Sequence, residues 1–295
     1  MSDHDAKSPY TVLSVERDGH VATVFLDRPE KRNAMGMAFF AELPAAMAEL
    51  GADREVRAIV IAARGPHFSV GLDLNALAGI AGEESGLGPG PGDKADEQGA
   101  HRGPSAAELA RRTHAEVLRL QGSISSVADC RKPVVAAVHG YCIGGGVDLV
   151  SACDVRVAAS DAVFSVRETK MAMVADIGSL ARLPLVLSMG HVAELVYTGK
   201  DVDAAFAERI GLVNHVYADA AAALSGAQAL ASEIAANSPL AVEGAKAVLS
   251  EVHRAQVDQA QRYVAAWNAG QLRSRDLTEA VTAFFERRPA SFEGR

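Results

Sequence analysis

Three carboxylic acids in the middle of the chain have the chemistry needed to move protons. Asp148 precedes Glu168 by twenty residues, and Asp176 follows Glu168 by eight. Carboxyl groups that lie close together titrate as a set, so one can hold a proton at neutral pH while another is ionised. General acid–base catalysis requires that division.

Each acid also has a structural interpretation. Asp148 would be a solvated residue in the first turn of a helix, where the helix dipole favours a negative charge. Glu168 would pair with a neighbouring cation, Arg167 or Lys170, at the surface. Asp176 would be the N-cap of a helix that begins near residue 178.

A glycine-rich turn, Gly144-Gly145-Gly146, precedes Asp148 and follows the apolar run 134–138. The run predicts a buried strand, and the turn leads into a short helix. Glycine lets a backbone N–H approach a ligand with no Cβ in the way. N–H groups at the start of a helix also point toward an anionic oxygen. The alternative is that the glycines only let the strand and the helix pack closely.

The elements that would position these residues begin with a hairpin, because β-favouring runs at 11–16 and 20–26 flank a turn. A helix is expected over about 35–50, with a kink or a restart at Pro44. The run 57–63 predicts the next strand.

Order is expected again from Ser105, which has the form of a helix N-cap followed by apolar residues at steps of three and four. Two short strands, 154–158 and 163–166, follow the central segment. From about Ala218 the chain is alanine-rich and helical, with Pro239 opening one helix.

Residues 79–104 interrupt this pattern and are rich in Gly, Pro and charged side chains. A stretch of this length without structure is usually functional or disordered in a compact domain. We expect a flexible surface insertion near the entrance of the site.

The composition is that of an ordinary globular protein, with 49% hydrophobic and 22% charged residues in 295. The net charge of −8 argues against nucleic-acid binding, which needs a basic face. No uncharged apolar run is long enough to cross a membrane, and the polar N-terminus has no signal region. Three cysteines without C-x-x-C spacing favour a reducing compartment. A cytoplasmic protein is therefore expected, and the absence of any zinc, Walker or dinucleotide-binding pattern predicts neither metal nor cofactor.

Three motifs, in this order along the chain, resemble those of the crotonase superfamily, the enoyl-CoA hydratase/isomerase family. They are Phe68-Ser69-Val70-Gly71-Leu72-Asp73-Leu74, then His139-Gly140 with the glycine triplet, and then Cys153-Asp154-Val155-Arg156. The resemblance extends from about Tyr10 to the C-terminus. It implies an α/β fold in which a spiral of ββα units over residues 9–200 precedes a C-terminal helical trimerisation region, 201–295. It also implies an acyl-CoA thioester as substrate and a homotrimer or homohexamer.

The same resemblance implies roles for individual residues. The backbone N–H groups of Leu72 and Gly145 would form an oxyanion hole for the thioester oxygen. The substrate would also be bound by residues near the coenzyme, namely Arg28, Lys31, Arg32, Val70, Asp73 and Phe284. The basic turn that carries Arg28, Lys31 and Arg32 could instead be a solvated loop. Phe284 would either close over the coenzyme of a neighbouring subunit or be a core aromatic.

Within the family, the three acids resemble the pattern of the Δ3,5-Δ2,4-dienoyl-CoA isomerases. Hydratases carry glutamates at the positions of Asp148 and Glu168, and simple enoyl isomerases rely on one acid at the Glu168 position. Shortening a glutamate to Asp148 withdraws its carboxylate by ~1.5 Å, and a misplacement on that scale can cost about a hundredfold in rate.

We therefore expect an isomerase of 3,5-dienoyl-CoA thioesters that acts in fatty-acid β-oxidation. Glu168 would take the proton at C2, Asp176 would return one at C6, and Asp148 would orient or bias them, with the order of base and acid left open. The alternatives are an enoyl-CoA hydratase of the same family and a catalytically silent acyl-CoA-binding protein.

Overall fold

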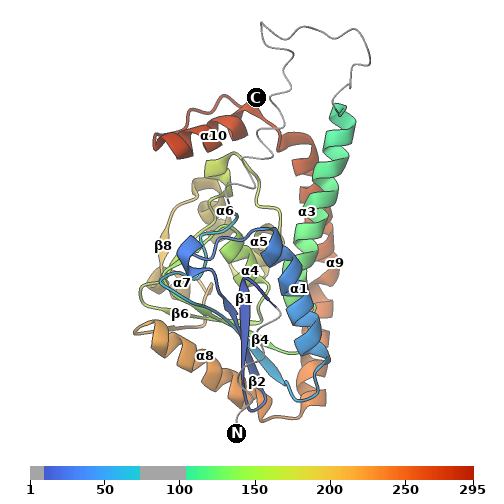
Figure 1. The fold of residues 1–295 in the computed structure, drawn as a ribbon, viewed down its shortest axis with the longest axis vertical. Helices are drawn as coiled ribbons and strands as arrows, with labels where there is room; N and C mark the ends of the chain where they lie inside the picture. Colours follow the sequence, from blue (N-terminus) through green and yellow to red (C-terminus); the bar gives the residue numbers. More distant parts are fainter. Residues whose placement is uncertain (1–9, 74–103) are drawn as a thin grey trace, which may run out of the picture.

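The computed structural model describes residues 10–73 and 104–295, and two sheets lie at its centre (Figure 1). The larger sheet has the order β1 (Leu13–Asp18), β2 (Val21–Leu26), β3 (Ala58–Ala63), β4 (Val134–Val138), β6 (Val155–Ala159), β9 (His215–Tyr217). Its first pair is antiparallel and the others are parallel, so the predicted hairpin is confirmed. The smaller sheet has the order β5 (Tyr141–Ile143), β7 (Val163–Ser165), β8 (Val202–Asp203).

The central strands of the larger sheet are buried on both faces. In β3, Ala58, Val60 and Ala62 face one apolar cluster, and the alternate residues Ile59 and Ile61 face another. This alternation follows from the two-residue period of a strand. Helix α8 (Ala220–Ala235) covers the first face with a row of small alanines, which lets it lie close to the sheet (Figure 1). The continuous apolar runs of the sequence therefore correspond to strands covered on both sides.

The other helices lie on the opposite face of the sheet or at its ends. They are α1 (Met37–Ala52), α3 (Ala106–Ala128), α4 (Gly145–Ser151), α5 (Ser179–Val186), α6 (Met189–Thr198), α7 (Ala204–Arg209), α9 (Pro239–Gln271) and α10 (Arg275–Glu286), with the short 3-10 helices η1 (Pro29–Lys31) and η2 (Glu168–Met171). Helices α1, α3 and α9 lie side by side (Figure 1). The predicted start of α3 is confirmed, because the Ser105 hydroxyl accepts a hydrogen bond from the Glu108 N–H at 3.2 Å.

Pro44 does not restart helix α1, which runs unbroken from Met37 to Ala52. A proline inside a helix removes one backbone hydrogen bond and costs about 3 kcal/mol. The same helix buries large apolar side chains, Phe39, Phe40, Leu43, Met47 and Leu50. Each of these contributes about 1.5–3 kcal/mol on burial, so tertiary packing outweighs the local cost.

The chain after residue 200 supplies more than helices. Strand β8 pairs with β7, and β9 pairs with β6, so both sheets extend beyond that position. The helical region expected from about Ala218 is confirmed as α8, α9 and α10, with Pro239 as the first residue of α9. The division at residue 200 stays a prediction, and the insertion predicted at 79–104 lies, apart from Pro104, outside the described residues.

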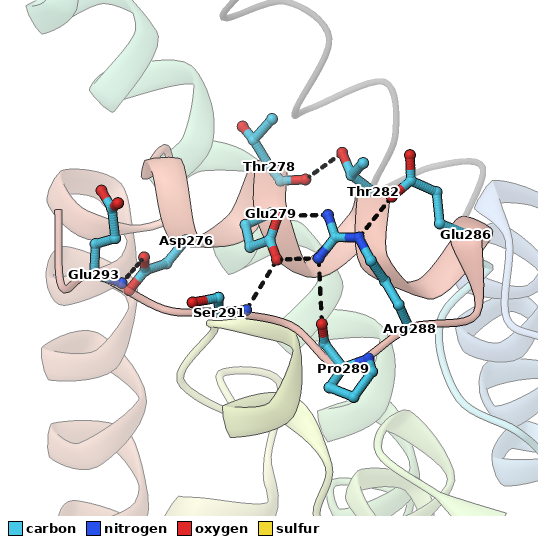
Figure 2. Close-up of polar contacts among 9 residues, drawn as sticks. All are labelled: Asp276, Thr278, Glu279, Thr282, Glu286, Arg288, Pro289, Ser291 and Glu293. Atoms are coloured by element: carbon cyan, nitrogen blue, oxygen red, sulfur yellow. Dashed lines mark hydrogen bonds and ion pairs between the residues drawn. The ribbon is translucent and has the colours of Figure 1, made fainter.

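The C-terminal segment folds back along α10 and is tied to it by polar contacts (Figure 2). Arg288 forms a two-pronged ion pair with Glu279, which also accepts a hydrogen bond from the Ser291 N–H at 2.9 Å. Asp276 accepts a further bond from the Glu293 N–H at 2.7 Å. On its inner side α10 packs against η2, and this contact fixes the helix beside Glu168. In the described part of the chain, no helix is long and apolar enough to cross a membrane.

Candidate active site

Two neighbouring cavities share four wall residues, Leu72, Gly145, Glu168 and Met173. The larger cavity has a volume of about 840 Å³ and the smaller one about 340 Å³. A ligand that passes the shared wall would therefore contact Leu72, Gly145 and Glu168 midway along its length.

The smaller cavity brings together all three predicted acids, Asp148, Glu168 and Asp176. Asp148 lies in the first turn of α4 and is 1% exposed. Glu168 is the first residue of η2, and Asp176 lies in the segment that joins η2 to α5. Helix α4, helix η2 and the segment that follows η2 thus direct three carboxyl groups into one cavity.

The structural interpretations of the three acids are not supported. Asp148 is buried rather than solvated. Arg167 pairs with Asp201 rather than with Glu168. The N-cap of α5 is Gly178, and Asp176 instead accepts a hydrogen bond from a side chain of α9.

Burial governs the charge of these acids. It raises the pKa of Asp148 to about 6, although the Ser179 N–H donates to Oδ1 and opposes the shift. Burial likewise raises the pKa of Asp176 to about 6, against a hydrogen bond from Asn268. The pKa of Glu168 is raised well above its usual range, by burial first and then by the charges of Asp148 and Asp176. Burial and the neighbouring carboxylates thus all favour the protonated form of Glu168.

Unsatisfied oxygens point to the same cavity. Asp148 Oδ2 and Glu168 Oε2 are buried and have no hydrogen-bond partner among the described residues. An unpaired buried oxygen costs about 1–3 kcal/mol, so native proteins rarely leave one without a reason. The site of a reacting ligand is one such reason.

The two expected oxyanion donors lie opposite each other. Met35 exchanges backbone hydrogen bonds with Gly71 and Asp73, so the intervening Leu72 N–H points away from Met35. Gly145 is the first residue of α4, and its N–H is one of the donors that a helix leaves unused. A Cβ built on Gly145 would lie 3.7 Å from the Leu72 nitrogen. Neither N–H donates to a backbone acceptor in the described ranges.

Two glycines create the space for this arrangement. Gly71 has a φ of +85°, and a Cβ there would lie 2.8 Å from the Ile143 oxygen and 3.2 Å from the Gly145 nitrogen. Gly144 has a φ of +52°, and its Cβ would meet Glu168 Oε1 at 3.1 Å. The glycine-rich turn thus leaves room for a carboxylate and for a close backbone approach, as well as packing the strand against the helix.

The larger cavity is lined by five of the six residues expected to bind the coenzyme, namely Lys31, Arg32, Val70, Asp73 and Phe284. The sixth, Arg28, is not on its wall. It donates to the Ala34 oxygen at 3.3 Å and lies 3.8 Å from Asp73 Oδ2, so it supports the turn and Asp73. Phe284 is 53% exposed and belongs to α10 of the same chain, so it is not a core aromatic.

Sequence reasoning missed several residues of the site. Lys170 adds positive charge to the larger cavity from η2, whereas its place in the sequence suggests only a surface partner of Glu168. Asn268 contacts Asp176 from ninety-two residues away along the chain. A single asparagine in a long helix carries no local signal, so only the packing of α9 reveals it.

Comparison with known proteins gives one consistent result. A family model described as enoyl-CoA hydratase/isomerase matches residues 16–87 and 99–295. The peroxisomal Delta(3,5)-Delta(2,4)-dienoyl-CoA isomerase of Arabidopsis thaliana is 38% identical over 286 residues, which cover 96% of this chain and 97% of that protein. The mitochondrial enzyme of the same name from Mus musculus is 38% identical over 289 residues, which cover 98% and 82%.

Solved structures share the fold. An enoyl-CoA hydratase/isomerase from Pseudoalteromonas atlantica T6c gives a TM-score of 0.77 at 25% identity, over 96% of this chain and all of that one. One from Mycobacterium paratuberculosis gives 0.76 at 27% identity, over 92% and 98%. The resemblance and the α/β fold inferred from the motifs are confirmed, and this chain belongs to the enoyl-CoA hydratase/isomerase family.

Proposed function

We propose that this protein isomerises 3,5-dienoyl-CoA thioesters to 2,4-dienoyl-CoA thioesters. The observation that carries the proposal is the meeting of three acids in one cavity whose wall also includes Leu72 and Gly145, two residues whose N–H groups donate to no backbone acceptor in the described part of the chain. A shift of two conjugated double bonds needs one proton removed and another delivered four bonds away, and two separate carboxyl groups suit that task. The names of the relatives with 38% identity favour the same reaction.

The layout of the cavities supports an orientation for the substrate. The coenzyme would occupy the larger cavity, near Lys31, Arg32 and Lys170, whose charges attract phosphate. The thioester oxygen would lie at the shared wall and accept hydrogen bonds from Leu72 and Gly145. The acyl chain would then extend into the smaller cavity past the acids.

In this orientation C2 adjoins the thioester carbon and lies near Glu168, which borders both cavities. Glu168 takes the C2 proton, and the electron pair moves to give an enolate conjugated with the two double bonds, with its charge on the thioester oxygen. Asp176, which borders only the smaller cavity, gives a proton to C6. The charge collapses, the double bonds lie at 2 and 4, and the proton count is unchanged.

The assignment of base and acid rests on position. Turnover in this direction needs Glu168 ionised and the proton on Asp176. The raised pKa of Glu168 favours the opposite arrangement in the free enzyme, with the proton on Glu168 and Asp176 ionised. A forward turnover leaves the two acids in this same state. Before the next forward turnover Glu168 must lose its proton and Asp176 must regain one. The charge of Asp148 raises the pKa of both acids.

Assembly as a homotrimer or a homohexamer is part of the proposal. The long helix α9 exposes apolar side chains that a water-facing helix would not need, with Leu240, Val248, Leu249 and Val252 each 67–85% exposed. Burying them against other subunits would remove this apolar surface from water. A role in fatty-acid β-oxidation is proposed from the substrate class. The expected cytoplasmic location stays a prediction, because the relatives are named for the peroxisome and the mitochondrion.

The test separates the two proton transfers. In D₂O, wild type should exchange the C2 protons of a 3,5-dienoyl-CoA and form a product labelled at C6. Asp176→Asn should still exchange at C2 but form diene at least a hundredfold more slowly, and Glu168→Gln should do neither. If Asp176→Asn isomerises at the wild-type rate, the proposal is wrong. Efficient hydration of a 2-enoyl-CoA by the same variant would indicate the hydratase instead.

A further inference from the structure

The Asp176 carboxylate receives a hydrogen bond from a single side chain in the described part of the chain, and that side chain is Asn268. The Asn268 amide nitrogen donates to Asp176 Oδ2 at 2.6 Å and to the Val174 oxygen at 2.9 Å. Both N–H bonds are therefore used, and the side chain is 2% exposed. The residue lies near the end of α9, with Ala265 buried one turn before it.

This geometry restricts Asp176 in two ways. The bond to Val174 holds the backbone two residues before the acid, and the bond to Oδ2 holds the carboxylate itself. Oδ2 is thereby engaged by Asn268, and no side chain of the described residues donates to Oδ1. Glu168 has no comparable support, because its Oε2 has no partner among the described residues.

We propose that Asn268 is a positioning residue that fixes the Asp176 carboxylate for proton transfer and stabilises its ionised form. The inference rests on the proposed role of Asp176 in the isomerase. A hydrogen bond donated to a carboxylate favours the charged state. Asn268 thus stabilises the anion that forms when Asp176 releases its proton to C6, and it selects the oxygen that carries this proton.

Other charged groups face Asp176, and their effect has to be kept constant in any test. Asp148 on α4 and Glu168 on η2 share its cavity, and Arg182 on α5 faces Asp148. The remaining charged side chains on the cavity wall come from α3 and from the segment between α9 and α10, namely Arg112, Glu116 and Arg273. None of these is altered by a substitution at Asn268, so a change in titration reports the lost hydrogen bond.

Gln121 on α3 provides a matched comparison. Its amide nitrogen donates to the Asp176 backbone oxygen at 2.6 Å and to the Gln261 oxygen at 3.0 Å, and it is 4% exposed. It therefore supports the same segment from another helix without touching the carboxylate. Gln121→Leu removes backbone support alone, whereas Asn268→Leu also removes the bond to the acid.

The experiment measures kcat and KM of diene formation across pH for wild type, Asn268→Leu and Gln121→Leu. We expect Asn268→Leu to lower kcat by about ten- to a hundredfold with little change in KM. The pH–rate limb that belongs to Asp176 should move to higher pH, because the carboxylate has lost a donor. Gln121→Leu should leave that limb in place. If Asn268→Leu does not fold, Asn268→Ala, which only removes atoms, replaces it.

A double variant separates the role of Asn268 from the proposed function of the enzyme. In Asp176→Asn enzyme, adding Asn268→Leu should leave C2 proton exchange unchanged, because the residue acts through Asp176. An unshifted limb and an unchanged kcat in Asn268→Leu, together with a large loss in Asp176→Asn, would overturn the role of Asn268 alone. Full isomerase activity in Asp176→Asn would overturn both.

Discussion

Replacing Gly71 by alanine should damage the oxyanion site without touching any acid. The residue has a φ of +85°, where an L-residue is strained by roughly 1–2 kcal/mol. The new Cβ would lie 2.8 Å from the Ile143 oxygen and 3.2 Å from the Gly145 nitrogen. Both neighbours are backbone atoms, so neither can swing aside as a side chain could.

The size of the effect follows from these distances. Ordinary contact begins near 3.4 Å, so the two segments must separate by about 0.6 Å. That movement shifts the Gly145 N–H relative to the Leu72 N–H and misaligns at least one donor. Losing one oxyanion donor costs about 2.7–4 kcal/mol of barrier, or about 10²–10³ in kcat. We expect a fall in kcat of about a hundredfold, with KM nearly unchanged because the oxygen gains its charge only in the transition state.

The assay is diene formation from a 3,5-dienoyl-CoA, with thermal unfolding measured on the same samples. Gly122→Ala is the matched control, because this glycine lies on the exposed side of α3 and its Cβ would meet nothing within 4 Å. The control should keep full activity. A folded Gly71→Ala enzyme with kcat within twofold of wild type would refute the assignment of the two N–H donors.

Two further predictions concern stability. Burial raises the pKa of Asp148 from 3.8 in the unfolded chain to about 6 in the folded protein. The folded state therefore binds this proton more tightly, and the stability that this supplies is complete below pH 3.8 and is lost as the pH rises through about 6. Asp148→Asn should therefore raise the melting temperature by several degrees at pH 7.5, from at most about 3 kcal/mol, and by much less at pH 4.5; an equal gain at both pH values would contradict this reasoning. Lys246 is 7% exposed and donates to Asp154 Oδ2 at 2.7 Å and to the Lys132 oxygen at 2.9 Å. Lys246→Met should cost about 1–3 kcal/mol in urea unfolding with kcat unchanged, less than for a fully buried pair because the Asp154 side chain is 35% exposed. A loss below about 0.5 kcal/mol would contradict a stabilising role for this pair.

Local signals in the sequence predicted the elements whose causes are local. The turn between β1 and β2, the Ser105 cap and the proline that opens α9 all act within a few residues, and the structure has each of them. Pro44 shows the limit of such reasoning. Its local cost is real, but the apolar face of α1 keeps the helix whole, and that face acts through tertiary contacts.

The candidate site was predictable only in part, because its parts come from distant segments. Spacing alone could not have joined Asp148, Glu168 and Asp176, and the resemblance to a family supplied that step. The resemblance placed Arg28 beside the coenzyme with Lys31 and Arg32; its side chain lies 3.8 Å from Asp73 Oδ2 and off the cavity wall, and its contact with the coenzyme stays a prediction. Asn268 and Gln121 reach the acid segment from α9 and α3, and the packing of those helices has no signature near residue 176.

The most direct measurement offers a 3,5-dienoyl-CoA and a 2-enoyl-CoA to the same enzyme preparation and follows the ultraviolet spectrum. A conjugated 2,4-diene has its own absorption band, whereas hydration bleaches the band of the 2-enoyl thioester. We predict fast diene formation and slow hydration. Fast hydration without diene formation would contradict the isomerase and indicate a hydratase, and neither activity with retained thioester binding would leave a protein that only binds acyl-CoA.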